Sequence, residues 1–364
     1  MPGGTELKNE VLASSTCALC GACLDWCPYL ANIEDHLVLR FDCNVPDGRC
    51  YSVCPRTFAD WQAISEKYLP DTPQNLAIGP HLKAYKVKAT KGVNGQQDGG
   101  TVSYLVKTIM EDEWAQTVLL TGADDHVTPE PFLSSEVDDI QKAAGSRFLA
   151  SPGMRKIIEA QNNKVQKLAV VGRPCQIQAL RKLDYNRPPE KPPMELLSIG
   201  LFCMWSLGWD FKDYLQKEFP GEEILRLAIP QHGFEVTTDK GVHELPINSV
   251  KQFNKPGCNY CLDMTSELAD ISVGAFEAQA GWNTVIVRTQ KGQELFDKAI
   301  AKGYLSAEEY PVEELDRLKG ASLGKKTRNL EHVQAAFDKG VKPFINLDSE
   351  YYIELKKLAE GMVK

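Results

Sequence analysis

Four closely spaced cysteines near the beginning of the chain constrain this sequence more than any other feature. Their spacing is C-x2-C-x2-C-x3-C-P, and the four residues are Cys17, Cys20, Cys23 and Cys27. Three thiolates at this spacing wrap one iron–sulfur cube, while the fourth cysteine points away to a second cluster. Gly21 lets the backbone pass close to inorganic sulfur. The segment is therefore predicted to fold around iron–sulfur clusters.

Three further cysteines complete a crossed pair of clusters. The first cluster is predicted to be held by Cys17, Cys20, Cys23 and Cys54. The second cluster is predicted to be held by Cys27, Cys43 and Cys50. This second half departs from a regular run, because the middle ligand position falls on Asp47 and Cys43 comes one residue early.

Asp47 is a possible fourth ligand of the second cluster. A carboxylate is a harder ligand than a thiolate and releases iron more easily. The second cluster is therefore expected to be a 4Fe-4S cube with one labile iron or a 3Fe-4S cluster. A structural zinc site is the alternative, although zinc favours two CxxC-like pairs over a triple run that ends in Cys-Pro.

Length and composition indicate an ordinary globular protein with two or three domains. The chain has 364 residues, of which 43% are hydrophobic and 25% charged. The net charge of -8 argues against a nucleic-acid surface. The sequence contains no apolar stretch of about 18 residues and no signal peptide, so we expect no membrane span. Eleven clustered cysteines then indicate metal or redox sites in a reducing compartment, and we expect a cytoplasmic protein.

The chain is predicted to divide into a small and a large domain. Residues 1–58 are expected to form a ferredoxin-like domain with two iron–sulfur clusters, 59–80 a linker, and 81–364 an α/β domain. Expected strands are 83–89, 117–120, 168–172, 196–202, 224–229, 234–238, 242–246, 268–275 and 281–289. Expected helices are 104–110, two within 134–162, 177–183, 209–218, 292–303, 312–319, 330–338 and 348–361.

Four cysteines lie outside the N-terminal run. Cys175 and Cys203 each follow an apolar strand, at the end where open α/β folds carry their active groups. Cys258 and Cys261 form a CxxC pair in a loop. The spacing leaves three alternatives open: a third iron–sulfur cluster, a CxxC redox pair, or a zinc site.

A glycine pair precedes the helix at 104–110. Asp98, Gly99 and Gly100 lead into Thr101 and Ser103, either of which could cap the helix. Backbone N–H groups at a helix start suit a phosphate. A plain loop-to-helix turn is the alternative.

The sequence from about residue 78 to 322 resembles the family of coenzyme F420 hydrogenase/dehydrogenase beta subunits. The matching segments occur in the family's order. They are Gln97–Val102, Ala144–Arg147, Ser151–Pro152, Gly172–Gln176, Gly200–Cys203, Cys258–Cys261, Glu267–Gly274 and Gly281–Thr289.

The resemblance implies an FAD-binding α/β domain with a 4Fe-4S cluster on Cys175, Cys203, Cys258 and Cys261. It also implies three segments against the FAD: Asp98–Thr101, Ser146–Arg147 and Gly281–Trp282–Asn283–Thr284. The N-terminal segment resembles the ferredoxin-type extension of some members. Arg173 departs from the smaller residue expected there; it either brings positive charge near the flavin or faces solvent.

The expected function is a redox subunit that passes electrons between a hydride carrier of the coenzyme F420 type and one-electron carriers. Partners implied by the resemblance are hydrogenase, formate dehydrogenase or heterodisulfide reductase subunits, or ferredoxin. Two alternatives remain open: a ferredoxin-linked FAD reductase of an organic substrate, and an electron-transfer adapter without catalysis. We assign no general acid or base, because the chemistry would belong to the FAD.

Overall fold

The largest element of the fold is an eight-stranded mixed sheet. The computed structural model describes all residues except 1, 93–96, 98, 231–232, 277–279 and 363–364. The strand order is β13-β3-β12-β11-β7-β6-β4-β5, with β4, β6, β7 and β11 parallel and the outer strands antiparallel to their neighbours. The strands are β3 Lys83–Ala89, β4 Thr117–Gly122, β5 Glu130–Ser134, β6 Lys167–Gly172, β7 Glu195–Leu201, β11 Ile271–Gly274, β12 Asn283–Val287 and β13 Leu305–Glu309. The sheet and its helices confirm the predicted mixed α/β class.

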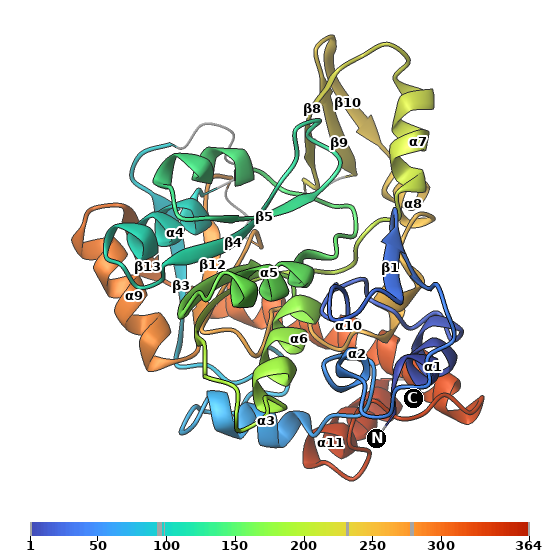
Figure 1. The fold of residues 1–364 in the computed structure, drawn as a ribbon. Helices are drawn as coiled ribbons and strands as arrows, with labels where there is room; N and C mark the ends of the chain where they lie inside the picture. The colour runs from blue at the N-terminus through green and yellow to red at the C-terminus, as the bar shows by residue number, and fades with distance from the viewer. Residues whose placement is uncertain (1, 93–96, 98, 231–232, 277–279, 363–364) are drawn as a thin grey trace.

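Helices cover both faces of this sheet (Figure 1). Successive side chains of a strand point to opposite faces. In β4, Val118 and Leu120 pack with α4 Thr101–Glu111 and α9 Gln290–Ala301. Leu119 packs on the other face with α5 Lys156–Asn162 and α6 Pro174–Tyr185. The apolar runs read as buried strands are therefore buried on two sides, as expected of parallel strands.

A short antiparallel sheet and a helical segment lie beside the main sheet (Figure 1). The sheet has the order β10-β9-β8. These elements are β8 Ile224–Ala228, β9 Phe234–Thr238, β10 Gly241–Leu245, α7 Asp210–Glu218 and α8 Ile247–Lys251. Buried Phe211, Phe234 and Val236 join them in a separate apolar cluster.

The N-terminal segment has little regular structure apart from short pieces. They are α1 Gly4–Leu7, the π-helix η1 Lys8–Leu12, the hairpin β1 Leu30–Ile33 with β2 His36–Leu39, and α2 Arg49–Ser52. Leu7, Val11 and Leu24 are buried together with cysteines of the segment. So much of this small core is cysteine that the predicted clusters would be a main part of it.

The stretch 59–80, expected as a linker, contains a helix, α3 Trp61–Tyr68. The Asp60 carboxylate accepts a hydrogen bond of 3.0 Å from Ala63 N–H and caps the helix. Ile64 and Leu69 are buried against the helices of the main sheet. The segment is therefore packed structure rather than an extended connection.

The helices expected at 312–319 and 330–338 are one continuous helix, α10 Val312–Asp338, followed by α11 Glu350–Met362. The prediction of two separate helices here was wrong. Gly320 and Gly324 lower helix propensity in the middle. Buried Ser322, Lys325 and Asn329 anchor the helix, so tertiary contacts outweigh that local cost.

Further differences concern edge strands and short helices. β5 contains Pro131, which is tolerated at an edge, and β13 is rich in charge; neither was expected. The expected first helix within 134–162 is the 3-10 helix η2 Val137–Ala143. Two more 3-10 turns are η3 Gly153–Arg155 and η4 Pro256–Tyr260. None of the described helices is long and apolar enough to span a membrane.

Candidate functional site

One small cavity in the N-terminal segment is lined by all four cysteines of the predicted first cluster. These residues are Cys17, Cys20, Cys23 and Cys54. Backbone N–H groups of Leu19 and Arg56 donate to the sulfurs of Cys17 and Cys54, each over 3.4 Å. Burial, and then the Cys54 thiol, raises the pKa of Cys17 to about 11. The four sulfurs thus face one interior space with N–H donors beside them.

The cysteines of the predicted second cluster are also neighbours. Burial raises the pKa of Cys50 to about 11, and the thiols of Cys27 and Cys43 add to the effect. The start of α1 closes over this group, since a Cβ added to Gly4 would lie 3.1 Å from the Cys43 sulfur. Asp47 is an exposed residue with a φ of 58° in the loop between Cys43 and Cys50. The N-terminal glycine contact was not anticipated from the sequence.

The four remaining cysteines meet at one edge of the main sheet. β6 and β7 are adjacent and parallel, so Cys175 and Cys203 follow them at the same edge. Burial raises the pKa of Cys175 to about 12, with Arg173 opposing and the thiols of Cys261 and Cys203 adding to it. Burial also raises the pKa of Cys203, and the thiols of Cys258 and Cys261 add to this effect. Ser206 N–H donates to the Cys258 sulfur over 3.3 Å.

The three cysteine groups follow one another through the interior. Burial, then the thiols of Cys175 and Cys54, raises the pKa of Cys20, which joins the first group to the third. Burial and the first-group thiols raise the pKa of Cys23, and Cys50 of the second group contributes as well. The first group therefore lies between the other two.

The N-terminal segment packs directly on the loops that carry the third group. Met154 N–H donates to the Cys20 carbonyl over 2.9 Å. A Cβ added to Gly257 would lie 2.1 Å from the Cys17 carbonyl oxygen. This close approach requires glycine immediately before Cys258.

Within the described part of the chain, no three histidine, cysteine or acidic side chains are grouped tightly enough to hold a single metal ion. A cube contains several irons, each bonded to its own cysteine, so its ligand sulfurs stand farther apart than the ligands of one zinc ion. The cysteine groups described above are wider than a single-ion site.

A large cavity of about 530 Å³ opens at the carboxyl ends of β6, β7 and β11, a size typical of small-molecule sites. Six of the residues expected to contact a cofactor line it: Gly100, Thr101, Ser103, Ser146, Arg147 and Asn283. Four others do not line it: Gly99, Gly281, Trp282 and Thr284. Asp98 lies outside the described residues.

Three of the four residues that do not line the cavity, Gly99, Trp282 and Thr284, have other contacts. Gly99 packs on Asn283, whose side-chain oxygen would be 2.6 Å from an added Cβ. Trp282 is buried beneath the ammonium groups of Lys86 and Lys88. Thr284 and Tyr310 share a buried hydroxyl contact of 2.9 Å. Strand alternation explains this outcome, because Asn283 and Thr284 point to opposite sides of β12.

Several polar atoms in the cavity wall lack a partner among the residues that the structure describes. These buried atoms include Thr101 Oγ1, Arg147 Nε and Ser151 Oγ. Helix α4 begins at this wall after Gly100, which has a φ of 67° and provides no side-chain cap. Burial lowers the pKa of Arg147, whose NH groups donate to the carbonyls of Ala144 and Ser146. Unpartnered donors and a helix N-terminus suit an anionic or polar ligand.

Apart from Arg173, the sequence did not identify a further set of residues that line the cavity. Arg173, Gln176, Phe202, Cys203 and Trp205 form this part of the wall. Arg173 is half-buried in this wall; its guanidinium donates to Ser206 Oγ and, over 3.2 Å, to the Ser151 carbonyl. Cys203 belongs both to this wall and to the third cysteine group, so the cavity and that group share a residue.

The sequence matches the models of a known protein family. Two family models describe the N-terminal and C-terminal parts of the coenzyme F420 hydrogenase/dehydrogenase beta subunit. Residues 84–157 match the N-terminal model, and residues 165–313 match the C-terminal model. Together the two models match more than half of the chain.

Two relatives and one solved structure extend the match. A component of the F(420)H(2) dehydrogenase of Methanosarcina mazei is 28% identical over 92% of this chain and 97% of its own. The coenzyme F420-dependent sulfite reductase of Methanocaldococcus jannaschii is 30% identical over 85% of this chain, which spans 50% of that protein. A chain in a structure of the F420-reducing NiFe hydrogenase complex of Methanosarcina barkeri has a TM-score of 0.68 and 27% identity, covering 75% of this chain and 98% of that one. The chain therefore belongs to the family of coenzyme F420 hydrogenase/dehydrogenase beta subunits.

Proposed function

We propose that this chain is a flavin and iron–sulfur redox subunit that passes electrons between a hydride carrier of the coenzyme F420 type and one-electron carriers. The observation that carries the proposal is the double role of Cys203, which lines the large cavity and also belongs to the third cysteine group. A hydride site and a one-electron site would then adjoin without an intervening layer of protein.

The residues of the large cavity fit FAD. Arg147 and the start of α4 would hold its phosphates, because Arg147 Nε and Thr101 Oγ1 lack a partner among the described residues and both the guanidinium and the helix N-terminus favour an anion. Val171, Leu201 and Phe202 supply the apolar wall that a flat ring system requires. FAD bound there would supply the conversion between two-electron hydride transfer and one-electron transfer.

The cysteine groups fit iron–sulfur clusters in the sets expected from the sequence. The first cluster would be held by Cys17, Cys20, Cys23 and Cys54. The second would be held by Cys27, Cys43 and Cys50, with Asp47 as candidate fourth ligand, and the third by Cys175, Cys203, Cys258 and Cys261. Backbone N–H groups on the sulfurs of Cys17, Cys54 and Cys258 would stabilise the electron-rich state of a bound cluster.

The arrangement of the groups supports one order of the groups along the electron path. The third group adjoins the cavity, the first lies in the middle, and the second lies around Cys43, which is partly exposed. Residues 1–58 would thus act as a ferredoxin-like outlet or inlet for a partner. Redox subunits of hydrogenase, formate dehydrogenase or heterodisulfide reductase type, or ferredoxin, are the partner classes we propose.

Anaerobic purification followed by stopped-flow kinetics tests the proposal. We expect bound FAD, about 11–12 iron atoms per chain, and rapid flavin bleaching by reduced coenzyme F420 followed by cluster reduction. If reduced coenzyme F420 does not reduce the bound FAD but ferredoxin does, the ferredoxin-linked reductase is supported instead. A chain without FAD that still exchanges electrons would support the adapter.

Single cysteine variants test the three ligand sets separately. We expect Cys203→Ala, Cys54→Ala and Cys50→Ala each to remove the iron and the spectroscopic signal of one cluster. Loss of the same signal in two of these variants would contradict the assignment. The first and third groups are in contact, so their signals must be resolved by potential as well as by iron content.

A further inference from the structure

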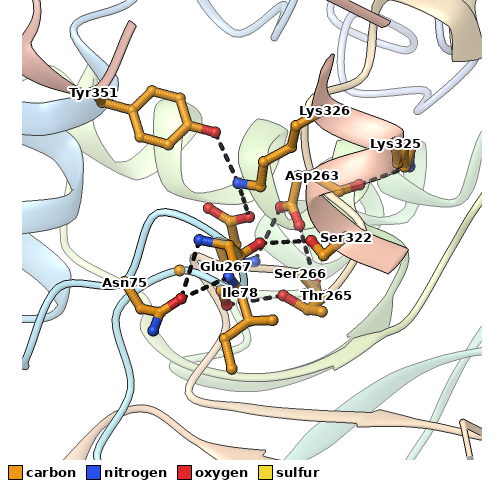
Figure 2. A network of polar contacts seen from close by, with 12 residues as sticks. Asn75, Ile78, Asp263, Thr265, Ser266, Glu267, Ser322, Lys325, Lys326 and Tyr351 are labelled. Atoms are coloured by element: carbon orange, nitrogen blue, oxygen red, sulfur yellow. Dashed lines mark hydrogen bonds and ion pairs between the residues drawn. The ribbon is translucent and has the colours of Figure 1, made fainter. Parts of the chain in front are cut away.

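A fully buried lysine of α10 contacts the third cysteine group. Lys325 is 1% exposed. Its ammonium donates to the carbonyl of Cys203 over 2.6 Å and of Asp263 over 2.8 Å, and it lies 3.7 Å from the sulfur of Cys261. Figure 2 shows the side chain reaching from the helix towards Asp263.

The neighbouring lysine has an ordinary partner. Lys326 is 0% exposed and pairs with the Glu267 carboxylate over 2.5 Å and with the Tyr351 hydroxyl over 2.8 Å (Figure 2). Two other buried cations are also paired, Arg181 with Asp270 over 3.0 Å and Lys255 with Asp35 over 2.8 Å. A carboxylate thus balances each of these charges at contact distance.

Lys325 lacks such a partner among the residues that the structure describes. Both oxygens of Asp263, the nearby carboxylate, accept hydrogen bonds from the N–H groups of Ser266 and Glu267, over 2.7 and 3.0 Å. A buried ammonium without a counter-ion carries a large desolvation cost. The Asp263 carboxylate is therefore engaged elsewhere, and the group in contact with the ammonium that would carry negative charge is the cysteine group itself.

We propose that Lys325 is a positioning residue that raises the reduction potential of the cluster held by Cys175, Cys203, Cys258 and Cys261. The inference rests on the proposed third cluster. Four thiolates around a cluster are anionic, and each added electron increases that negative charge. A fixed cation beside one ligand sulfur stabilises the reduced state more than the oxidised state, because the reduced cluster carries one more negative charge. The low-dielectric surrounding strengthens this interaction.

Lys325 lies outside the residues that the family models match. The family models end at residue 313, whereas α10 runs from Val312 to Asp338. Asn329, one turn further along the same helix face, donates to the carbonyls of Cys258 over 3.0 Å and Cys261 over 2.8 Å. This helix therefore holds the CxxC loop as well as supplying the charge.

The test is an EPR-monitored redox titration of the holoprotein. Lys325→Met removes the charge, Lys325→Gln removes the charge but keeps a donor, and Lys325→Arg keeps the charge. Lys319→Met is the matched control, because Lys319 lies on α10, is partly exposed and pairs with Asp316 over 3.3 Å. We expect the neutral variants to lower the equilibrium constant for reduction of the third cluster by about tenfold, or about 59 mV for one electron. Lys325→Arg and Lys319→Met are expected to keep the wild-type potential within a third of that shift.

Each other outcome also decides the matter. A neutral variant that keeps its iron and shifts no more than Lys319→Met overturns the role of Lys325. If both neutral variants lose the third cluster while Lys325→Arg keeps it, the cation is required for the cluster and the role is supported. Loss in all three variants indicates a packing role and overturns it. Absence of a third cluster from the wild-type protein instead contradicts the proposed function.

Discussion

The ammonium of Lys182 lies 2.7 Å from the carbonyl oxygen of Cys54, although 128 residues separate them in the sequence. The same ammonium donates to the carbonyl and hydroxyl of Thr57, over 2.9 and 2.7 Å. Lys182 is 2% exposed on helix α6. A helix of the main sheet thus fixes the end of the N-terminal cysteine segment.

We expect Lys182→Met to destabilise this attachment by about 1–3 kcal/mol, since two buried carbonyls lose their donor. The measurement is the denaturation midpoint together with the iron content of the purified chain. Lys167→Met is the control, because Lys167 is half-exposed and its carboxylate contact with Glu195 is long, at 3.9 Å. Equal midpoints for the two variants would contradict a structural role of Lys182.

Asp270 joins three elements through its buried carboxylate. It accepts from Arg181 over 3.0 Å, from the N–H and hydroxyl of Ser198 over 2.8 and 2.6 Å, and from Thr289 over 3.0 Å. We expect Asp270→Asn to cost about 3–5 kcal/mol, because it leaves Arg181 buried without its counter-ion. Asp316→Asn, at an exposed position of α10, should change the unfolding midpoint little.

The same carboxylate predicts a pH dependence of stability. Burial by itself raises the pKa of Asp270, but the Arg181 charge and the Ser198 hydrogen bonds outweigh it and hold the pKa below its ordinary value of 3.8. Around and below pH 3.8 the folded state therefore binds fewer protons than the unfolded state. The contribution of the Asp270 carboxylate to the free energy of unfolding is complete above pH 3.8 and is lost as the pH falls below it. Unfolding midpoints measured from pH 6 down to 2.5 should fall less steeply for Asp270→Asn than for the wild type. Parallel pH profiles would contradict this prediction.

Gly257→Ala tests the contact between the two cysteine-bearing segments. The new Cβ would lie 2.1 Å from the Cys17 carbonyl oxygen, so backbone must move. Such overpacking costs about 1–3 kcal/mol, and we expect reduced iron occupancy of the first and third groups. In Gly320→Ala, the added methyl has no atom within 4 Å. That variant should gain about 0.5–1 kcal/mol from helix propensity, which gives an opposite shift in the denaturation midpoint.

Arg147→Met tests the assignment of the large cavity. The variant removes a half-buried guanidinium whose buried Nε has no partner among the described residues. If this group binds the FAD phosphates, the dissociation constant of FAD should rise at least about tenfold, because a charge-assisted hydrogen bond is lost. Fluorescence titration of the deflavinated chain measures it. Arg317→Met, at an exposed site, serves as the control, and equal affinities would exclude Arg147 from the FAD site.

Much of the fold was predictable because its signals are local. The apolar runs 168–172 and 196–202 predicted strands, which the structure has as β6 and β7. The cysteine that follows each run was expected at one edge of the sheet, and the two strands are parallel neighbours. The edge strands β5 and β13 were missed because an edge tolerates proline and charge, which blur the alternation. Helix α10 was predicted as two helices, 312–319 and 330–338; the contacts that bury Lys325 and Asn329 between them could not be read from the local sequence.

The sequence predicted the two N-terminal cysteine groups, since short ligand spacings are a property of the local chain, and the resemblance to a family predicted the third. It also determined the family, through ordered segments that the family models match. Only the tertiary structure decided that Arg173 and Cys203 share a cavity wall, that Trp282 and Thr284 lie outside it, and that Lys182 and Lys325 reach cysteine carbonyls across long stretches of sequence. The reason is physical: a buried cation is placed by what surrounds it in space, and neither residue carries a local pattern that distinguishes it from a solvated lysine.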